Sequence, residues 1–242
     1  KSSAGVISVG PEAELGNCKK NPQATLTTLL EQVREKGLAT GIVSTARVTH
    51  ATPAATYAHS VHRDWESDGD IPKDMRECAE DIASQLLSNG PINVVLGGGR
   101  AEFLPVTEAD PEYQDKTGKR QDGRNLVAEW QKANAGGRYV WNRAQFDGIA
   151  ENFSGNILGL FEPSHMQYEA DRTDEPSLSE MTATAITRLK QDQNGFFLMV
   201  EAGRIDHGHH AGNAYRALKD GQELANAVQV AVNQTADEDT LI

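Results

Sequence analysis

The chain has 242 residues, enough for one large α/β domain, and neither an internal repeat nor a Pro/Ser-rich linker divides it. Its 35 acidic residues outnumber 23 basic ones, and the formal net charge of −12 argues against nucleic acid as a partner and for a soluble surface. No apolar run approaches the roughly 20 residues that span a bilayer. No signal peptide is visible at Lys1, which says nothing about export if the chain is a piece of a longer protein.

Helical and extended patterns alternate along the chain. Leu26, Leu29, Leu30 and Val33 recur at the i, i+3, i+4, i+7 spacing of one helix face, which Gly37 ends. Such alternation favours an α/β fold with strands buried on both faces. Strands are expected at 5–9, 40–45, 92–96, 138–141, 157–161 and 196–200 and from 239 onward, and helices at 26–36, 77–88, 126–133, 178–189 and 214–232.

Two local signals refine these elements. The segment 176–180 carries a capping-box pattern, with Ser177 three residues before Glu180, and predicts the start of a long helix. The glycines at 97–99 invite a phosphate-cradle interpretation, but the spacing and the lysine of a P-loop are missing, so close packing of strand and loop explains them better. The segment 101–123 is acidic and turn-rich, and we expect an excursion from the core at about 101–176.

The stretch after the strand at 196–200 is rich in metal-binding residue types. Glu201 stands at the carboxyl end of that strand, where open α/β sheets place their ligands. Asp206 and His210 are four residues apart, so a helix would put both on one face. A solvated turn, or Asp206 as a helix N-cap, is the plain alternative. Three histidines and two acids within ten residues favour a zinc site instead.

A second polar cluster, at 46–65, follows the strand at 40–45 in the same way. Two acid/His clusters at strand ends, combined with strand-helix alternation, indicate an α/β metallohydrolase. The two cysteines, Cys18 and Cys78, belong to no Cys-x-x-Cys or Cys/His cluster, so metal binding by them is not expected. A disulfide that closes a long loop and two separate thiols both stay open.

Four stretches resemble the alkaline phosphatase family in order and separation, and the resemblance runs from about residue 5 to residue 242. It implies a sandwich of helices around a largely parallel central sheet, here as a partial chain, incomplete at both ends, that forms a single domain over 1–242. The stretches are 44–54, 59–65, 96–100 and 200–210.

The resemblance implies metal-dependent hydrolysis of phosphate monoesters at alkaline pH through a phosphoserine intermediate in the complete enzyme. Two zinc ions and one magnesium ion serve the family's site. Asp206 and His210 match two ligands of the first zinc, and Thr52 and Glu201 match two ligands of the magnesium. Arg63 matches the arginine that binds phosphate, a role that suits the planar fork of a guanidinium.

Five of the other histidines divide into two groups. His50 and His207 match positions that differ between branches of the family, and their pairing resembles the magnesium-favouring animal type. Both are expected to contact metal-bound or phosphate-bound water and so to tune affinity. His59, His62 and His209 match no motif position, and we expect them to be structural or solvent-facing.

A possible calcium site and the exported setting also come from the resemblance. Glu112, Phe161, Glu162 and Glu175 fall near the animal-type calcium site, with Phe161 contributing its carbonyl, although Glu175 stands where that pattern has Asp. Surface acids of an acidic protein are an equally good interpretation. The two cysteines, Cys18 and Cys78, match a disulfide of animal-type members, which favours a periplasmic or extracellular protein. The family resemblance implies a homodimer that binds small phosphate monoesters and inorganic phosphate, and leaves membrane attachment open.

Several parts of the family's site have no match here. No Asp-Ser pair occurs in the 242 residues. The family's nucleophile is expected ahead of residue 1, and an Asp-His pair for the second zinc and a further histidine for the first are expected beyond residue 242. An early Asp that bridges the second zinc to magnesium also has no match. We therefore expect these residues alone to be inactive. Two alternatives stay open: a non-catalytic metal-binding fragment, and a related phosphodiesterase or sulfatase with the same metal scaffold.

Overall fold

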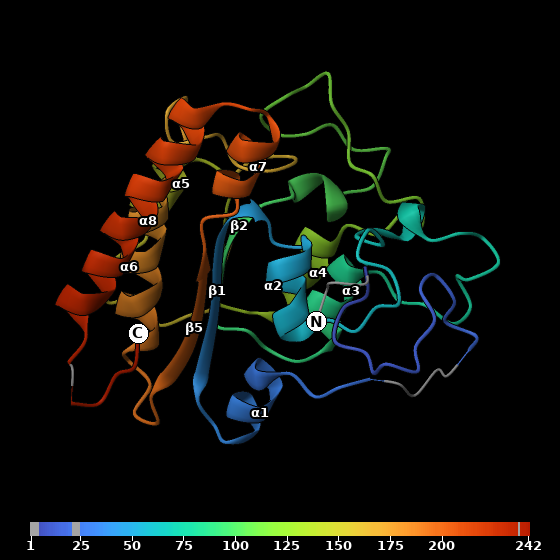
Figure 1. Cartoon of the computed structure of the whole chain (residues 1–242), viewed down its shortest axis with the longest axis horizontal. Helices are drawn as coiled ribbons and strands as arrows, with labels where there is room; N and C mark the ends of the chain where they lie inside the picture. The colour runs from blue at the N-terminus through green and yellow to red at the C-terminus, as the bar shows by residue number, and fades with distance from the viewer. Residues whose placement is uncertain (1–4, 21–24, 237) are drawn as a thin grey trace. The chain divides into compact units, whose positions relative to one another are not determined.

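The computed structural model describes residues 5–20, 25–236 and 238–242, and the chain divides into two units (Figure 1). Unit 1 comprises Lys1–Gly37, Thr49–Pro91 and Gly99–Ala135, and unit 2 comprises Leu38–Val48, Ile92–Gly98 and Gly136–Ile242. All five strands of the described sheet lie in unit 2. The single domain over 1–242 stays a prediction.

Unit 2 is built on a five-stranded parallel sheet with the strand order β3-β4-β2-β1-β5. Gly41 in the middle of β1 lies opposite Val94 of β2 and Leu198 of β5. This arrangement confirms the predicted α/β class with a parallel sheet. The strands are β1 (Ala39–Arg47), β2 (Val94–Gly98), β3 (Arg138–Val140), β4 (Ile157–Leu160) and β5 (Phe196–Glu201).

Helices flank the sheet of unit 2, and α6 packs on β1, β2 and β5 while α8 packs on α6. The capping box predicted for α6 is present: the Ser177 hydroxyl accepts from the Glu180 amide, and the Glu180 carboxylate accepts from the Ser177 amide. Strands and α6 share a core that includes Val43, Leu96 and Met181. The helices are α5 (Arg143–Asp147), α6 (Leu178–Leu189), α7 (Arg204–His210) and α8 (Ala214–Gln234).

Unit 1 contains short helices and long irregular segments. Part of its interior is a small apolar cluster of Cys18, Val61, Trp65 and Ile71. Buried charged side chains make up another part, and Arg100 and Arg120 are both 0% exposed. The helices are α1 (Leu29–Glu35), α2 (Ala51–Tyr57), α3 (Ile82–Ser88) and α4 (Leu126–Ala133), with 3-10 turns at Asp68–Asp70 and Arg100–Glu102.

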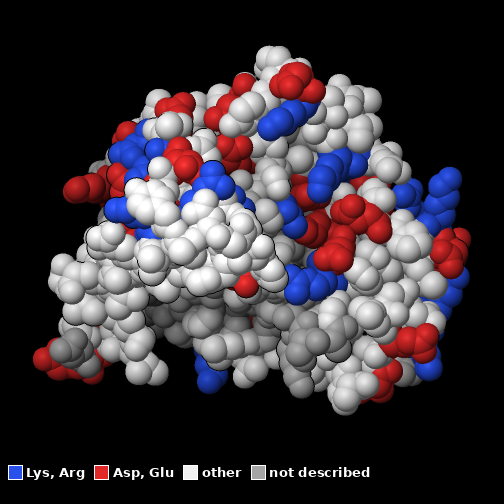
Figure 2. All heavy atoms as spheres, turned by 45° about the horizontal axis from the view of Figure 1, so that its top comes forward, with Lys and Arg blue, Asp and Glu red and all other residues white. Residues whose placement is uncertain are grey.

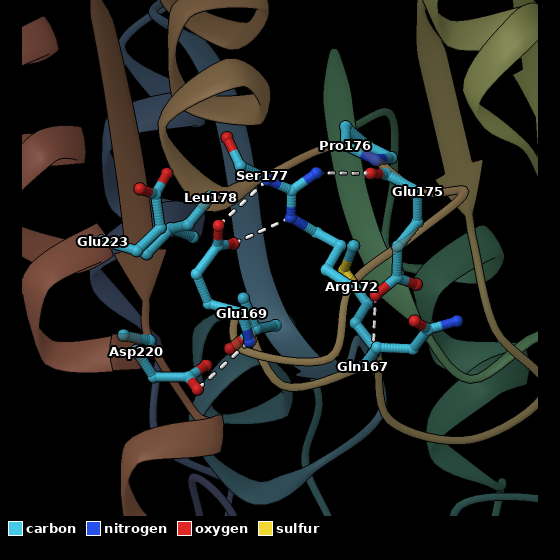
Figure 3. Close-up of a pocket in the computed structure, with 12 residues that line it drawn as sticks. Gln167, Glu169, Arg172, Glu175, Pro176, Ser177, Leu178, Asp220 and Glu223 are labelled. Carbon is cyan, nitrogen blue, oxygen red and sulfur yellow. Dashed lines mark hydrogen bonds and ion pairs between the residues drawn. The ribbon is translucent and has the colours of Figure 1, made fainter. Parts of the chain in front are cut away.

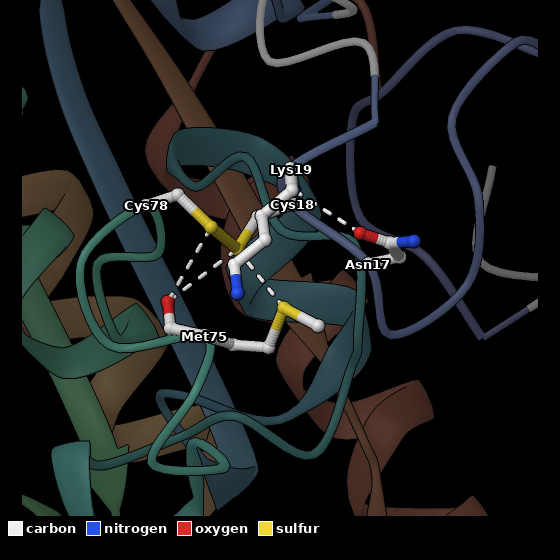
Figure 4. Close-up of a disulfide and its surroundings, with 5 residues drawn as sticks. All are labelled: Asn17, Cys18, Lys19, Met75 and Cys78. Atoms are coloured by element: carbon white, nitrogen blue, oxygen red, sulfur yellow. Dashed lines mark hydrogen bonds between the residues drawn. A yellow bond between two sulfur atoms is a disulfide. The ribbon is translucent and has the colours of Figure 1, made fainter.

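A disulfide joins Cys18 to Cys78 across 60 residues of unit 1 (Figure 4). The sulfur of Met75 lies 3.7 Å from the Cys18 sulfur, and Trp65 belongs to the same apolar cluster. The pairing implied by the family resemblance is therefore present. In the chain-entropy treatment, closing a loop of this length stabilises the fold by about 4 kcal/mol.

Gly97 and Gly98, the last two residues of β2, serve close packing, as predicted. A Cβ atom on Gly98 would lie 2.2 Å from the carbonyl oxygen of Ser164, and one on Gly97 would lie 2.8 Å from the carbonyl oxygen of Ser44. Real Cβ atoms do not approach backbone oxygens this closely, so only glycine fits between these segments.

Two predicted helices begin later than expected, because side-chain caps fix their first turns. The helix expected from Leu26 begins at Leu29, where the Thr28 hydroxyl accepts from the Glu31 amide. The helix expected from Glu77 begins at Ile82, where the Asp81 carboxylate accepts from the Ser84 amide.

Three strand predictions were wrong. Residues 5–9 form isolated bridges, Ile7 to Ser60 and Val9 to Thr25, without a strand. Residues 239–242, all described, form no strand, and the Thr240 amide turns back to donate to the Ala236 carbonyl. The strand expected to be buried on both faces is β5, which lies at an edge of the described sheet and is only half-buried because β1 alone pairs with it.

The surface mixes both signs of charge. On the face drawn in Figure 2, basic and acidic side chains lie next to each other, so the net negative charge makes no single-sign area there. Among the described residues, no helix combines the length and apolar character needed to cross a membrane.

Candidate metal centre

The turn between β5 and α7 brings Asp206 and His210 onto an exposed helix face. A Cβ atom on Gly203 would lie 2.8 Å from Cβ of Ala46, so the chain passes close to the end of β1. The Arg204 amide donates to Oγ1 of Thr45 at 3.2 Å, which ties the start of α7 to that same strand. A helix does begin after Gly203, and Asp206 lies inside it instead of capping it.

Asp206 and His210 have the separation that two ligands of one zinc ion have. Asp206 Oδ2 lies 3.4 Å from His210 Nε2, and the side chains are 72% and 80% exposed. Oxygen and nitrogen ligands about 2.0–2.1 Å from a tetrahedral zinc ion lie about 3.3–3.4 Å from each other. A carboxylate and an imidazole are also the ligand types that zinc accepts. This pair therefore fits a zinc ion.

Glu201 is held in place by the neighbouring strand. The hydroxyl of Ser44, which lies opposite Glu201 in the β1-β5 register, donates to Glu201 Oε2 at 2.6 Å. The same hydroxyl oxygen accepts from the Ala46 amide at 2.9 Å. The carboxylate is thus fixed at the carboxyl end of β5, with the hard oxygen chemistry that magnesium requires.

The second polar cluster lies in unit 1, where Arg63 and His50 come together. Arg63 Nη2 lies 3.3 Å from His50 Nε2, and the Arg63 amide donates to the Gly5 carbonyl at 2.7 Å. His50 is the N-cap residue of α2, and Thr52 is an exposed residue in the first turn of that helix. Arg63 keeps about a third of its side chain exposed, so its donors are accessible.

His207 lies between two partners that the sequence did not reveal. Arg204 Nη1 lies 3.1 Å from His207 Nδ1, one helical turn away. The ring of His165 lies 4.2 Å from that of His207, centroid to centroid, with the planes tilted by 53°. His165 Nδ1 in turn lies 3.1 Å from the Arg47 amide nitrogen, at the end of β1.

An acidic pocket of unit 2 lies beside these strand ends (Figure 3). Thr45 and Ala202 line it together with Glu175, Asp220 and Glu223. Burial raises the pKa of Asp220 to about 6, although its hydrogen bond from the Glu169 amide at 3.2 Å works in the opposite direction. The Arg172 guanidinium pairs with the Glu169 carboxylate at 2.8 Å, and Figure 3 shows it turned toward this side chain.

The residues matched to a calcium site divide between the units. In unit 2, the side-chain amide of Gln167 donates to Glu162 at 3.2 Å, and its backbone amide donates to Glu175 at 2.6 Å, so Gln167 joins the two buried carboxylates. Phe161, which precedes Glu162 in the chain, is also buried. In unit 1, Glu112 accepts from the buried Arg100 at 2.8 Å, so its carboxylate already has a cationic partner.

The fold agrees with that of known proteins. A sequence model of the alkaline phosphatase family matches residues 1–242. The chain belongs to the alkaline phosphatase family.

Alignments with two curated relatives take in the whole chain. The tissue-nonspecific alkaline phosphatase of Gallus gallus is 45% identical over 251 aligned positions, which take in 100% of this chain and 48% of the relative. An alkaline phosphatase of Gadus morhua is 42% identical, with 100% and 52% covered. The crystal structure of Thermus thermophilus alkaline phosphatase is 30% identical at a TM-score of 0.72, covering 98% of this chain and 44% of that one. The chain thus spans about half the length of these alkaline phosphatases.

The histidines that match no family motif lie in ordinary environments. His59 Nε2 pairs with Glu31 at 2.9 Å and is mostly buried. His62 stacks on Trp65, with ring centroids 5.8 Å apart. His209 is exposed on α7. These placements agree with the structural or solvent-facing roles expected for them.

Two residues near the candidate site were missed in the sequence. Arg204 lies three positions before His207, and side chains at this spacing meet on a helix, so the helical pattern itself could have pointed to their contact. His165 offered no such signal, because it follows a different strand and lies 42 positions from His207.

Proposed function

We propose that this chain is part of a metal-dependent alkaline phosphatase that hydrolyses phosphate monoesters at alkaline pH through a phosphoserine intermediate in the complete enzyme. The observation that carries the proposal is the Asp206–His210 pair, 3.4 Å apart on α7 directly after β5, in a chain that belongs to this family. Its ligands would be small phosphate monoesters and inorganic phosphate.

The metals are assigned by donor chemistry. Asp206 and His210 would hold zinc, and Glu201, fixed by Ser44, would be a magnesium ligand together with Thr52. When bound, such ions polarise phosphoryl oxygens and stabilise the charge that develops in the transfer. His50 and His207 would contact phosphate-bound or metal-bound water. Glu162, Glu175 and the Phe161 carbonyl are proposed for calcium; Glu112 enters that set only if it exchanges its pairing with Arg100.

Arg63 is the phosphate-binding residue of the proposal. Its partly exposed guanidinium can donate two parallel hydrogen bonds to phosphate oxygens, a geometry that a lysine does not reproduce. Because guanidinium nitrogens only donate, the contact with His50 Nε2 requires that ring nitrogen to accept. His50 therefore helps to orient Arg63 without competing for its charge.

The setting and assembly are part of the proposal. The Cys18–Cys78 disulfide supports a periplasmic or extracellular location, because such bonds persist in oxidising compartments. A homodimer is proposed from family membership.

A second candidate concerns these 242 residues on their own. They contain no Asp-Ser pair to match the family's nucleophile, which favours metal and phosphate binding without turnover. Assay of the 242-residue chain with a chromogenic phosphate monoester at alkaline pH, with zinc and magnesium supplied, tests this. Metal-dependent turnover that co-purifies with the chain would contradict the second candidate.

Substitution of Arg63 tests the first candidate. Arg63→Ala should weaken binding of inorganic phosphate by about 1.5 to 3 kcal/mol, the scale of a charge-assisted hydrogen bond, and lower kcat/KM by a similar factor wherever turnover is present. Phosphate affinity is measured by calorimetry with both metals supplied. Arg124→Ala is the control, since the ion pair of Arg124 with Glu129 is exposed. Unchanged phosphate affinity in Arg63→Ala would contradict the assignment.

A further inference from the structure

Arg204, the first residue of α7, contacts the end of β1, the Tyr168 ring and His207 of its own helix. Its amide donates to Thr45 at the end of β1, and its guanidinium carbon lies 3.7 Å from the centre of the Tyr168 ring. Its Nη1 lies 3.1 Å from Nδ1 of His207. The side chain is half-buried, so these contacts restrict its position. Arg204 is therefore placed to transmit the position of the sheet and of Tyr168 to His207.

The contact with His207 determines which ring nitrogen carries the proton. A guanidinium has five N–H donors and no acceptor, so His207 Nδ1 must accept. In the neutral ring the proton then lies on Nε2. A hydrogen bond to one ring nitrogen is the usual way in which a protein fixes the tautomer and orientation of a functional histidine.

Two aromatic contacts hold this arrangement. The face of Tyr168 supports the Arg204 guanidinium at a distance typical of cation–π contacts. Arg216 lies over the same ring at 4.7 Å and pairs with Asp171 at 2.8 Å. On the other side, the His165 ring lies 4.2 Å from the His207 ring. His207 is thus restrained at its edge by Arg204 and at its ring by His165.

We propose that Arg204 is a positioning residue of the phosphatase site, which holds His207 with Nδ1 as the acceptor and Nε2–H as the donor that serves phosphate-bound or metal-bound water. The inference rests on the proposed function for the role of His207. The tautomer itself does not depend on that function, so the two can be tested separately.

The first test is spectroscopic. In the 242-residue chain with ¹⁵N-labelled histidine, the couplings of ring protons to the two ring nitrogens distinguish the tautomers, and His207→Gln assigns the signals of His207 among the seven histidines. We expect an unprotonated Nδ1 and a protonated Nε2 at neutral to alkaline pH, and a clear change of the Nδ1 signal in Arg204→Met. A protonated Nδ1 in the unsubstituted protein, or an unchanged Nδ1 signal in Arg204→Met, would overturn the inference.

The second test is a double-mutant cycle on the binding of inorganic phosphate, with zinc and magnesium supplied. Arg204→Met should weaken phosphate binding about threefold to tenfold, the range of one hydrogen bond. In the His207→Gln background the same substitution should change binding less than about twofold, since Arg204 would act through His207. Equal effects in both backgrounds would mean that Arg204 is merely structural, and would overturn the inference.

Matched variants guard against loss of folding in Arg204→Met. Tyr168→Leu removes the ring under the guanidinium and should weaken phosphate binding in the same direction, whereas Tyr168→Phe keeps the ring and should not. Arg216→Met removes the other guanidinium on that ring, which is not the one bonded to His207, and should leave the His207 signals and phosphate affinity unchanged. Equal effects of Arg216→Met and Arg204→Met would overturn the inference. If the unsubstituted 242-residue chain does not bind phosphate, the candidate in which these residues alone bind phosphate fails, and the spectroscopic test still decides the role of Arg204.

Discussion

Arg120 in unit 1 and Asp206 in unit 2 show opposite uses of charge. The Arg120 side chain is 0% exposed and donates to both carboxylate oxygens of Asp81, at 2.9 and 3.1 Å, and to Asp122. The Asp206 side chain is 72% exposed, and its neighbour His210 is 80% exposed. Arg120 lies 2.9 Å from Asp81 and Asp206 lies 3.4 Å from His210, so distance alone does not separate an architectural pair from a candidate ligand pair.

The two pairs differ in exposure and in saturation, by which we mean the share of their donors and acceptors that already have a partner in the protein. Burial by itself would lower the pKa of Arg120, but its hydrogen bonds with Asp81 and Asp122 outweigh that effect and raise it. Such a guanidinium serves the fold, because a donor given up to a ligand would deprive the buried Asp81 carboxylate of its cationic partner. Asp206 and His210 can exchange water for a metal at little cost to the fold. The loosely held pair is therefore the better candidate for function.

The largest effect on the free energy of unfolding is expected when Arg120 is removed from its cluster with Asp81 and Asp122. Arg120→Met should lower the free energy of unfolding by about 3 to 5 kcal/mol, because it leaves the buried Asp81 carboxylate without its cationic partner. Denaturant unfolding measures the change. Lys20→Gln, which removes the exposed pair with Glu14, should leave the free energy of unfolding almost unchanged. Similar losses in the two variants would contradict the distinction between saturated and exposed charges.

Interactions between residues close in the sequence could be predicted, and those between distant residues could not. The Asp206–His210 pair is set by one helical turn, and the α6 capping box by three residues, so both were accessible to pattern arguments. The disulfide followed only from family resemblance. The start of α3 was placed too early, since the helical pattern from Glu77 outweighed the cap at Asp81 that decides it.

Contacts between residues far apart in the sequence could not be predicted from it. Arg120 and Asp81 are 39 residues apart, and nothing in either segment marks the other as its partner. The segment 101–123 looked like a polar excursion, yet it supplies the buried Glu102, Asp110 and Arg120. The contact of His165 with His207 likewise needs the end of β1, the loop after β4 and helix α7 in place. Tertiary packing brings such residues together, and a single sequence carries no record of it.

Buried charge in unit 1 should also leave a pH signature. Burial raises the pKa of Glu102 to about 7 from 4.5, with Glu66 adding to the rise and Lys119 opposing it. Because the folded state holds this proton more tightly, Glu102 contributes stability that is fully present below pH 4.5 and is lost as the pH rises through about 7. At 1.36 kcal/mol for each pKa unit, the loss is at most about 3 kcal/mol.

Glu102→Gln isolates that contribution. The variant keeps a neutral side chain at all pH values, so its stability should fall less than that of the unsubstituted protein between pH 4.5 and 7. Denaturant unfolding across this range gives both slopes. Glu129→Gln is the control, because its pairing with Arg124 lowers the pKa of Glu129 and moves its titration toward more acidic pH. Identical slopes for Glu102→Gln and the unsubstituted protein would show that Lys119 keeps Glu102 charged.

The exposed pair should give the smallest effect on the metal-free protein and a distinct effect with metal. Without zinc, Asp206→Asn and His210→Gln should each change the free energy of unfolding by less than about 1 kcal/mol, as for other exposed pairs.

With zinc at about 100 times its Kd, the free energy of unfolding of the unsubstituted protein should rise by about 2.7 kcal/mol, because zinc binds only the folded state. Either variant should lose most of that gain. His209→Gln alters an exposed histidine of the same helix that matches no motif position, and should keep the full gain. Thermal unfolding with zinc and with a chelator measures all four proteins. If zinc still stabilises Asp206→Asn and His210→Gln but no longer stabilises His209→Gln, the metal binds to other ligands. If Asp206→Asn or His210→Gln loses much stability without zinc, the pair is architectural, as Arg120 is.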